Sequence, residues 1–203
     1  MTEGCFLCKP DPSLVVDLRS NAFAMVGLGP ITSKYCVLSA RMHVRSLADL
    51  CLERPQAIAD IENLRDRLRA GGDDLLMTEH GRVPVCRDGG DLHDEHCFHG
   101  HALLFAAKTD ISGQASSFYS VSAKFADLQS AMEHAALQEH YLLVSPSADR
   151  HFVFSGPLNV PRQLSRTLVA IAEGVSHQAD WRSDPRHEEA RQMAESLRGM
   201  GRI

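Results

Sequence analysis

Short apolar segments separated by turn residues dominate the first half of the chain. Residues 22–28 and 34–40 each have the composition of a strand, and Gly29-Pro30 between them is typical of a turn. This pattern predicts an antiparallel hairpin. A third strand is predicted over residues 73–80, and a fourth is predicted from 97 to 106 after a polar, glycine-rich loop.

Helical spacing follows the hairpin. Residues 46–50 begin a helix, Pro55 restarts it, and apolar side chains then recur every three or four residues up to Gly71-Gly72. The second half of the chain predicts a strand over 117–122, a helix over 125–137, a strand pair over 140–145 and 151–155, a helix that begins at 161–163, and a charged helix at the C-terminus.

Antiparallel strands interspersed with helices, without regular strand–helix–strand alternation, predict an α+β fold. With 203 residues, the chain is long enough to bury a core without disulfides or metal ions to hold it together. Apolar residues make up 44% of the sequence and charged residues 23%, which argues against wholesale disorder.

The charge pattern narrows the classes of partner. The formal net charge is −5, so the basic surface expected of a protein that binds duplex DNA is not apparent. A small anionic ligand needs only a few placed donors and remains compatible. No apolar run approaches the roughly 18–20 residues of a membrane span, and residues 1–4 lack the pattern of a signal peptide, so we expect a cytoplasmic protein.

Cys5 and Cys8 form a C-x-x-C pair, whereas the other four cysteines are scattered. Six cysteines in a chain of this length do not indicate a disulfide framework. A redox pair would follow a strand and begin a helix, but no strand precedes Cys5, and Pro10 and Pro12 follow Cys8. A turn that holds two thiolates on one metal ion fits this context better. Two unpaired thiols are the other alternative.

Four of the eleven histidines fall within residues 93–101. On a strand, alternation places Cys97, His99, His101 and Leu103 on one face, with successive imidazoles about 6.5–7 Å apart. One imidazole can therefore bind a metal ion while the next faces a substrate. The alternative is a half-buried strand whose histidines are satisfied by ordinary hydrogen bonds.

Other histidines are weaker candidates for this chemistry. His93 and His96 lie in the polar loop, where we expect them to be solvated. His43 follows the predicted hairpin and precedes a helix, which makes it one candidate for a further metal ligand. Spacing alone does not choose among the remaining candidates.

Four segments resemble those of histidine-triad (HIT-like) proteins, and they occur in the same order. Residues 29–32 and 37–50 resemble the hairpin and the start of the helix, residues 79–81 (Glu-His-Gly) resemble the end of a strand, and residues 99–105 fall where the family carries its H-x-H-x-H strand. The resemblance covers roughly residues 4–106 and is looser around 161–163 and 180–182.

The resemblance implies a HIT-like fold, with an antiparallel sheet of about five strands, helices packed on it and a C-terminal helical extension. It also implies a zinc-containing catalytic domain over residues 1–145 and a strand and helical extension over 146–203 that packs on the same domain. Members of the family commonly dimerise, so a homodimer is one outcome that the sequence leaves open.

The zinc-bearing branch of the superfamily includes galactose-1-phosphate uridylyltransferase, which the chain resembles in its ligand pattern. Carried over position by position, this resemblance implies one structural zinc ion per chain, bound by Cys5, Cys8, His43 and His99. Four protein ligands close the coordination sphere of zinc, so such an ion would not act as a Lewis acid.

The family's nucleophilic histidine corresponds to His101, which implies attack on an α-phosphorus and a nucleotidyl-histidine intermediate. Two positions depart from the family. Leu103 stands where the third polar group of the triad is expected, and Gly27 stands near the position of a residue that holds the ribose hydroxyls. One contact to the transition state is therefore missing, and ribose recognition is in question.

The leading hypothesis is a HIT-like nucleotide hydrolase or nucleotidyltransferase, which acts on a nucleotide or another phosphorylated small molecule. Two alternatives stay open: a ligand-binding protein that has lost catalysis, and a HIT-like scaffold that serves a biosynthetic reaction. Phosphate donors are expected from Ser112, Gly113, Gln114 and Gln163, although Gln163 fits a surface residue at a helix start equally well.

Overall fold

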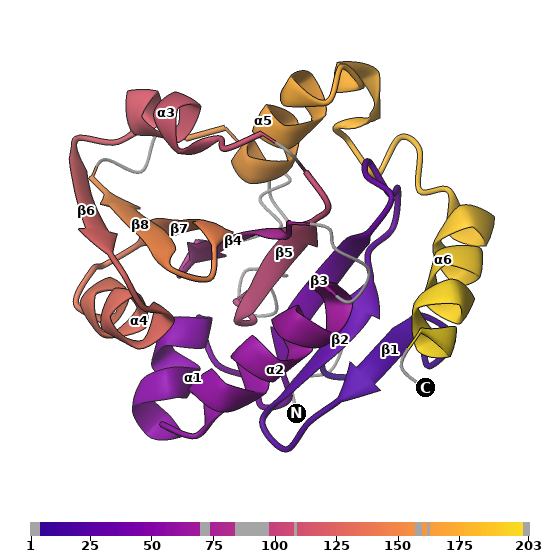
Figure 1. Cartoon of the computed structure of the whole chain (residues 1–203), viewed down its shortest axis with the longest axis horizontal. Coiled ribbons are helices and arrows are strands. Elements are labelled where there is room, and N and C mark those ends of the chain that lie inside the picture. Colours follow the sequence, from indigo (N-terminus) through magenta and orange to yellow (C-terminus); the bar gives the residue numbers. More distant parts are fainter. Residues whose placement is uncertain are drawn as a thin grey trace.

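The computed structural model describes residues 5–69, 74–83, 98–107, 109–156, 160–161 and 163–200. Over these residues, eight strands form one antiparallel sheet in the order β1-β2-β3-β5-β4-β7-β8-β6 (Figure 1). The strands are β1 (Val15–Leu18), β2 (Ala22–Val26), β3 (Tyr35–Ala40), β4 (Leu76–Gly81), β5 (His101–Phe105), β6 (Val121–Phe125), β7 (Tyr141–Ser147) and β8 (Arg150–Ser155).

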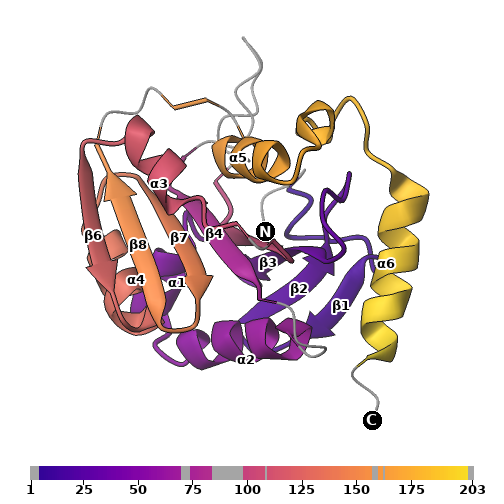
Figure 2. The same ribbon diagram turned by 45° about the horizontal axis from the view of Figure 1, so that its top comes forward.

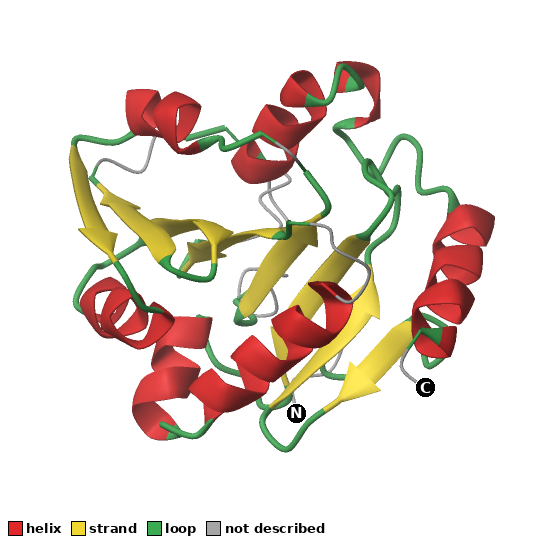
Figure 3. Ribbon diagram, in the orientation of Figure 1, coloured by secondary structure: helices red, strands yellow, loops and turns green. Residues whose placement is uncertain are grey.

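Helices cover both faces of this sheet (Figures 2 and 3). One face carries α1 (Leu47–Glu53), α2 (Ala57–Arg69) and α4 (Leu128–Ala136), and the other carries α3 (Ser112–Ala115) and α5 (Leu164–Ala172). At the edge formed by β1 lies α6 (His187–Gly199), and two short 3₁₀ helices are η2 (Ser116–Phe118) and η3 (Ser176–Gln178). None of the helices in the described ranges has the length and apolar character needed to cross a membrane.

Each face of the sheet has its own apolar core. Under α1, α2 and α4, the inward side chains of the strands pack with buried residues such as Leu50, Leu64 and Met132. On the opposite face, Tyr35 and Phe105 stack with ring centroids 5.2 Å apart, and α5 covers this part of the sheet with Leu164. Neighbouring residues of β5 therefore face different cores.

The prediction of about five strands is wrong, because the sheet has eight. The strands β7, β8 and β6 continue the sheet from the outer side of β4, where Thr78 pairs with Val144. The sequence predicts most of these strands individually. It does not predict that they join the sheet of the first hairpin, because this depends on pairing between strands that are far apart in the sequence. Strand β1 was not predicted: it has four residues, and its register shifts between Val15 and Asp17.

Several elements follow local signals. The hairpin is confirmed, with Ala22 paired to Ala40 and Val26 to Cys36. The helix start is also confirmed: Ser46 caps α1 by accepting a hydrogen bond from the Asp49 N–H (3.0 Å).

Two predicted strand boundaries are wrong. The segment 117–122 contains the end of η2, and β6 begins only at Val121, so this strand continues beyond the predicted range. The strand predicted over 97–106 begins at His101 in the structure, so His99 precedes it. Cys97 and the loop histidines His93 and His96 lie outside the described residues.

The division of the chain at residue 145 stays a prediction. Strand β7 runs across that point, and α6 packs against β1 and β2. The Arg198 guanidinium donates to the carbonyl oxygens of Ser13 (3.0 Å) and Val15 (3.1 Å). The C-terminal segment thus packs on the N-terminal part of the chain.

Gly100 lies where β3, α1 and β5 meet. Its N–H donates to the Val44 carbonyl (2.7 Å), and its carbonyl accepts from the Ala40 N–H (3.0 Å). A Cβ at this position would lie 2.5 Å from the backbone carbon of Ser46, which cannot move without displacing α1. Glycine is therefore required here by close backbone packing.

We expect Gly100→Ala to lower the free energy of unfolding by about 1–3 kcal/mol, because the added methyl group forces the α1 backbone away from β5. Urea denaturation followed by circular dichroism measures the change. Gly199→Ala is the matched control, since no atom lies within 4 Å of a Cβ there. Equal stability of the two variants would contradict the packing constraint.

Candidate functional site

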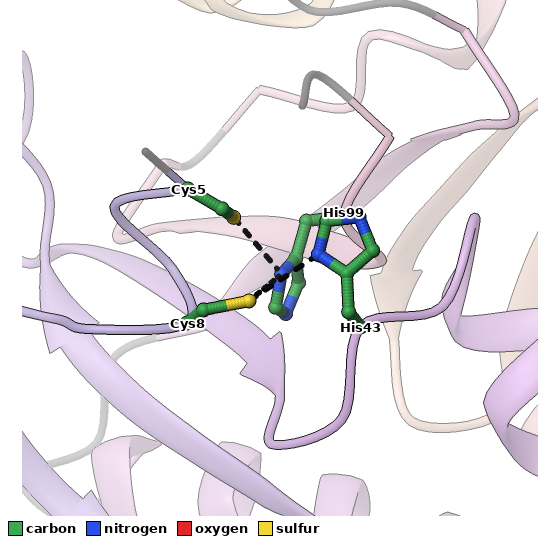
Figure 4. Close-up of side chains that lie close together, drawn as sticks. All are labelled: Cys5, Cys8, His43 and His99. Carbon is green, nitrogen blue, oxygen red and sulfur yellow. Dashed lines mark hydrogen bonds between the residues drawn. The ribbon is translucent and has the colours of Figure 1, made fainter. Parts of the chain in front are cut away.

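Four side chains from distant parts of the sequence converge beside the sheet (Figure 4). Cys5 Sγ lies 3.3 Å from Nδ1 of His99, and Cys8 Sγ lies 3.3 Å from Nδ1 of His43 and 3.6 Å from Nδ1 of His99. All four ligand atoms lie within 4.8 Å of one another. This group, which we call the Cys₂His₂ cluster, could hold one metal ion.

Local backbone structure brings each ligand into the cluster. A turn places the two thiols on one side, with the Cys8 N–H donating to the Cys5 carbonyl (3.1 Å). His43 lies in the loop between β3 and α1, and His99 directly precedes Gly100. The two imidazole rings meet edge to face, with centroids 5.0 Å apart. The predicted set of four ligands is thus brought together in full.

The hydrogen bond on the far side of His99 fixes which nitrogen faces the thiols. Nε2 lies 2.8 Å from the Ala40 carbonyl oxygen, so Nε2 carries the proton and Nδ1 presents a lone pair. Burial lowers the pKa of His99 to about 4, which keeps the ring neutral, and burial raises the pKa of the Cys5 thiol. A neutral imidazole is the form that binds metal ions.

His101 is the first residue of β5, and its side chain lies on the face covered by α5. Its Nδ1 lies 2.7 Å from the His99 carbonyl oxygen, so Nδ1–H donates to it and Nε2 keeps a lone pair. Within the described chain, the His101 ring makes no other hydrogen bond. Burial lowers the pKa of His101, so the ring is neutral at neutral pH.

Leu103 lies on the same face as His101, between Val37 on β3 and Thr78 on β4. It is partly buried and packs against both apolar cores. The hydroxyl of Thr78 is buried and has no hydrogen-bond partner among the described residues. An apolar side chain therefore stands next to an unpaired hydroxyl, at the position where the sequence lacks its third polar group.

The predicted phosphate donors lie in α3 and directly before α5, the helices above this face. Ser112, Gly113 and Gln114 form α3, whose first N–H donates to Asp110 Oδ1 (2.8 Å). Gln163 precedes α5 with a left-handed backbone (φ 53°), and its amide donates to Asp180 Oδ1 (3.2 Å). Among the described residues, no hydrogen bond links any of these four to His101.

Gly27 has a packing explanation. A Cβ at this position would lie 2.3 Å from the ring of Tyr35, which stacks on Phe105 and receives the Arg166 guanidinium over its face (5.0 Å to the centroid). The aromatic ring takes the space that a side chain at residue 27 would need. The absence of a polar side chain here thus follows from the core.

Three further polar residues have no role predicted from the sequence, and one of them, His80, lies close enough to His101 to interact with it electrostatically. These are His80 on β4, Tyr119 after η2 and His140 before β7, and the signal for His80 was only its place in the Glu-His-Gly segment. His80 Nε2 lies 3.1 Å from the Tyr119 hydroxyl. The residues are far apart in the sequence, so their proximity depends on strand register and on the path of the chain after α3.

No family model and no curated protein matches the chain. Among solved structures, it is similar to a "HIT family hydrolase from Clostridium thermocellum Cth-393", with 16% sequence identity and a TM-score of 0.38. The match covers 52% of this chain and 91% of that chain.

We expect Cys8→Ser to lower bound metal from about one ion per chain to less than a tenth and to reduce the melting temperature, because metal binding is coupled to folding. Elemental analysis of untagged protein and a thermal melt measure the two effects. Cys51→Ala is the control, since this half-buried thiol lies outside the cluster. Metal content unchanged by Cys8→Ser would contradict the assignment.

Proposed function

We propose that the chain is a HIT-like nucleotide hydrolase or nucleotidyltransferase, with His101 as the nucleophile and a structural zinc ion in the Cys₂His₂ cluster. The observation that carries the proposal is the hydrogen bond from His101 Nδ1 to the His99 carbonyl (2.7 Å). This hydrogen bond directs the Nε2 lone pair of His101 away from the backbone. His99, two residues earlier, belongs to the cluster.

The donor set and its spacing support zinc. Two ligands of one tetrahedral zinc ion, a sulfur and a nitrogen, lie about 3.5 Å apart, given Zn–S of about 2.3 Å and Zn–N of about 2.0–2.1 Å. Three of the four sulfur–nitrogen distances in the cluster are 3.3 to 3.6 Å, and the fourth is no more than 4.8 Å. Thiolate and imidazole together are typical ligands of structural zinc.

Bound zinc would supply a cross-link rather than a reactive group, because four protein ligands leave no open position. Cys5 and Cys8 would tie the N-terminal turn to His43 and His99. The His99 side chain would bind the zinc ion, and the His99 carbonyl accepts the hydrogen bond that orients the His101 ring. The cross-link would therefore also help to fix the position of this ring.

The reaction forms and breaks one bond at phosphorus in each half. The lone pair on His101 Nε2 attacks an α-phosphorus of a phosphate ester, anhydride or phosphoramidate, and the bond to the leaving group breaks. Water or another acceptor then attacks the nucleotidyl-histidine, releases the nucleotide and returns the electron pair to Nε2. The nucleoside 5′-phosphate is the transferred group.

Ser112, Gly113, Gln114 and Gln163 are retained as candidates for binding the phosphate. They lie in α3 and at the start of α5, the two helices that cover the His101 face (Figure 2). A second candidate function, a nucleotide-binding protein without catalysis, is favoured by the apolar packing of Leu103.

We expect His101→Asn to abolish nucleotidyl transfer, because asparagine has no nucleophilic lone pair at the position of Nε2. Intact-protein mass spectrometry after incubation with a sulfo- or acyl-nucleotide anhydride should show an adduct on the wild type and none on the variant. His177→Asn, at an exposed histidine on η3, is the control. Zinc content and the circular dichroism spectrum should be unchanged. Binding of the nucleotide without an adduct on the wild type would favour the non-catalytic alternative.

Leu103→His should raise turnover of poor donors selectively. One positioned donor to a developing oxyanion is worth about 10²–10³ in rate, and a good leaving group needs less of this help. We therefore expect the wild type to prefer a sulfo- or acyl-nucleotide anhydride over a nucleotide phosphoramidate of a simple amine.

Leu103→His should reduce the difference in turnover between the anhydride and the phosphoramidate. The buried Thr78 hydroxyl would offer the new imidazole a hydrogen-bond partner. Turnover of both donors by wild type, Leu103→His and the exposed control Leu52→His measures the effect, with folding checked by circular dichroism. Equal changes on both donors would show that residue 103 is not near the leaving group.

A further inference from the structure

A second set of polar side chains lies on the sheet face that carries His101. His80 Nε2 lies 3.1 Å from the Tyr119 hydroxyl, and within the described chain the His80 ring makes no other hydrogen bond. Two residues earlier on β4, the Thr78 hydroxyl is buried without a described partner. Polar groups therefore line this face on β4 as well as on β5.

Strand register places His80 opposite His101. The antiparallel pairing of β4 with β5 joins Leu76 to Phe105 and Thr78 to Leu103. Continued by two residues beyond its last pair, this offset matches His80 with His101, and the two rings are close enough to interact electrostatically. Residues opposite each other in an antiparallel pair project to the same face. The two imidazoles thus project to one side of the sheet from adjacent strands.

The two strands separate at this point. The pairing of β4 with β5 ends at Thr78 and Leu103, although β5 stays paired to β3 as far as His101 and β4 stays paired to β7 as far as Gly81. Figure 1 shows β4 and β5 diverging beyond their shared segment. His80 and His101 therefore lie on either side of the point where the two strands separate, just beyond their last paired residues.

The surroundings keep the His80 ring neutral. Burial, followed by the neighbouring His140 and His101, lowers the pKa of His80 to about 4. A neutral imidazole donates one hydrogen bond and accepts another. Burial also raises the pKa of the Tyr119 phenol, so this hydroxyl keeps its proton. When the Tyr119 hydroxyl donates to His80 Nε2, the proton of the His80 ring is on Nδ1.

We propose that His80 is a catalytic residue that donates a hydrogen bond from Nδ1 to an oxygen of the phosphoryl group attacked by His101, with Tyr119 as the positioning residue for its ring. The inference rests on the proposed function and adds a residue to it. His80 transfers no proton in this role; its N–H stabilises the charge that develops on the phosphoryl oxygens. A neutral histidine is suited to this task because it donates without being ionised.

The inference accounts for the apolar third position on β5. Leu103 cannot donate to a phosphate, but His80 projects to the same face from the adjacent strand, beside the nucleophile. The donor would thus come from β4 rather than from the strand that carries His101. The ligand class is a nucleoside monophosphate unit, and the phosphoryl group is the part that His80 contacts.

Side-chain replacements at residue 80 separate the two ring nitrogens. The amide nitrogen of asparagine overlaps the position of Nδ1, whereas that of glutamine overlaps Nε2. We expect His80→Phe and His80→Gln to lower kcat on a sulfo-nucleotide anhydride about 10²-fold, with KM changed less than threefold. His80→Asn should retain at least ten times the kcat of His80→Gln.

Tyr119→Phe should lower kcat about tenfold and leave KM unchanged, because it loosens the His80 ring without removing its donor. His177→Phe, at an exposed histidine, is the control for a ring replacement. A purely structural role of His80 predicts equal losses for the asparagine and glutamine variants, and that result would overturn the inference.

A binding measurement tests the contact without relying on turnover. Ring-nitrogen NMR signals of zinc-loaded wild-type protein, assigned with His80→Phe and His101→Asn, are followed during titration with adenosine monophosphate and, separately, with inorganic phosphate. We expect the His80 and His101 signals to shift together and to saturate at the same ligand concentration.

The outcomes separate this inference from the proposed function. A shift of the His101 signals without a shift at His80 would overturn the role of His80 and leave the nucleophile in place. Absence of any shift at either histidine, together with absence of a nucleotidyl adduct, would overturn the proposed function and the inference with it. Joint shifts without an adduct would support phosphoryl binding by His80 while contradicting nucleotidyl transfer.

Discussion

The backbone of Gly100 is held from both sides, and the fold and the candidate site both depend on this. Its N–H binds the Val44 carbonyl, its carbonyl binds the Ala40 N–H, and the start of α1 lies too close for any side chain. His99 and His101 flank this fixed point. One imidazole is consequently held in the Cys₂His₂ cluster, and the next begins β5 on the face under α5.

Successive residues at the end of β4 have different roles. Glu79 is buried beneath α1, where burial raises its pKa to about 8, and it accepts hydrogen bonds from the Leu47 N–H (2.5 Å) and the Tyr141 hydroxyl (2.7 Å). His80 projects to the opposite face, towards Tyr119. Gly81 has no Cβ because the ring of Tyr141 occupies that space. Alternation along β4 therefore ties the helix to the sheet on one face and leaves an imidazole on the other.

Part of the candidate site could be predicted because its signals are local or come in a recognisable order. The C-x-x-C spacing placed two thiols in one turn, and the resemblance to HIT-like proteins selected His43 and His99 from many histidines. The period-two argument for a shared face fails at His99, since β5 begins only at His101. His80 and Tyr119 could not be found in this way, because their proximity depends on strand register and on the path of the chain after α3.

The hairpin, the capped start of α1 and the chemistry of the cluster's donors could be derived from the sequence, because each depends on residues close together or on side-chain type. Three other features could be seen only in the folded protein: the sheet has eight strands, Tyr35 fills the space above Gly27, and the pairing of β4 with β5 ends before His101. Those features arise from pairings and packing between distant segments. The energies of these contacts depend on which strands and side chains meet when the whole sheet forms, and no short segment of the sequence contains both contacting residues.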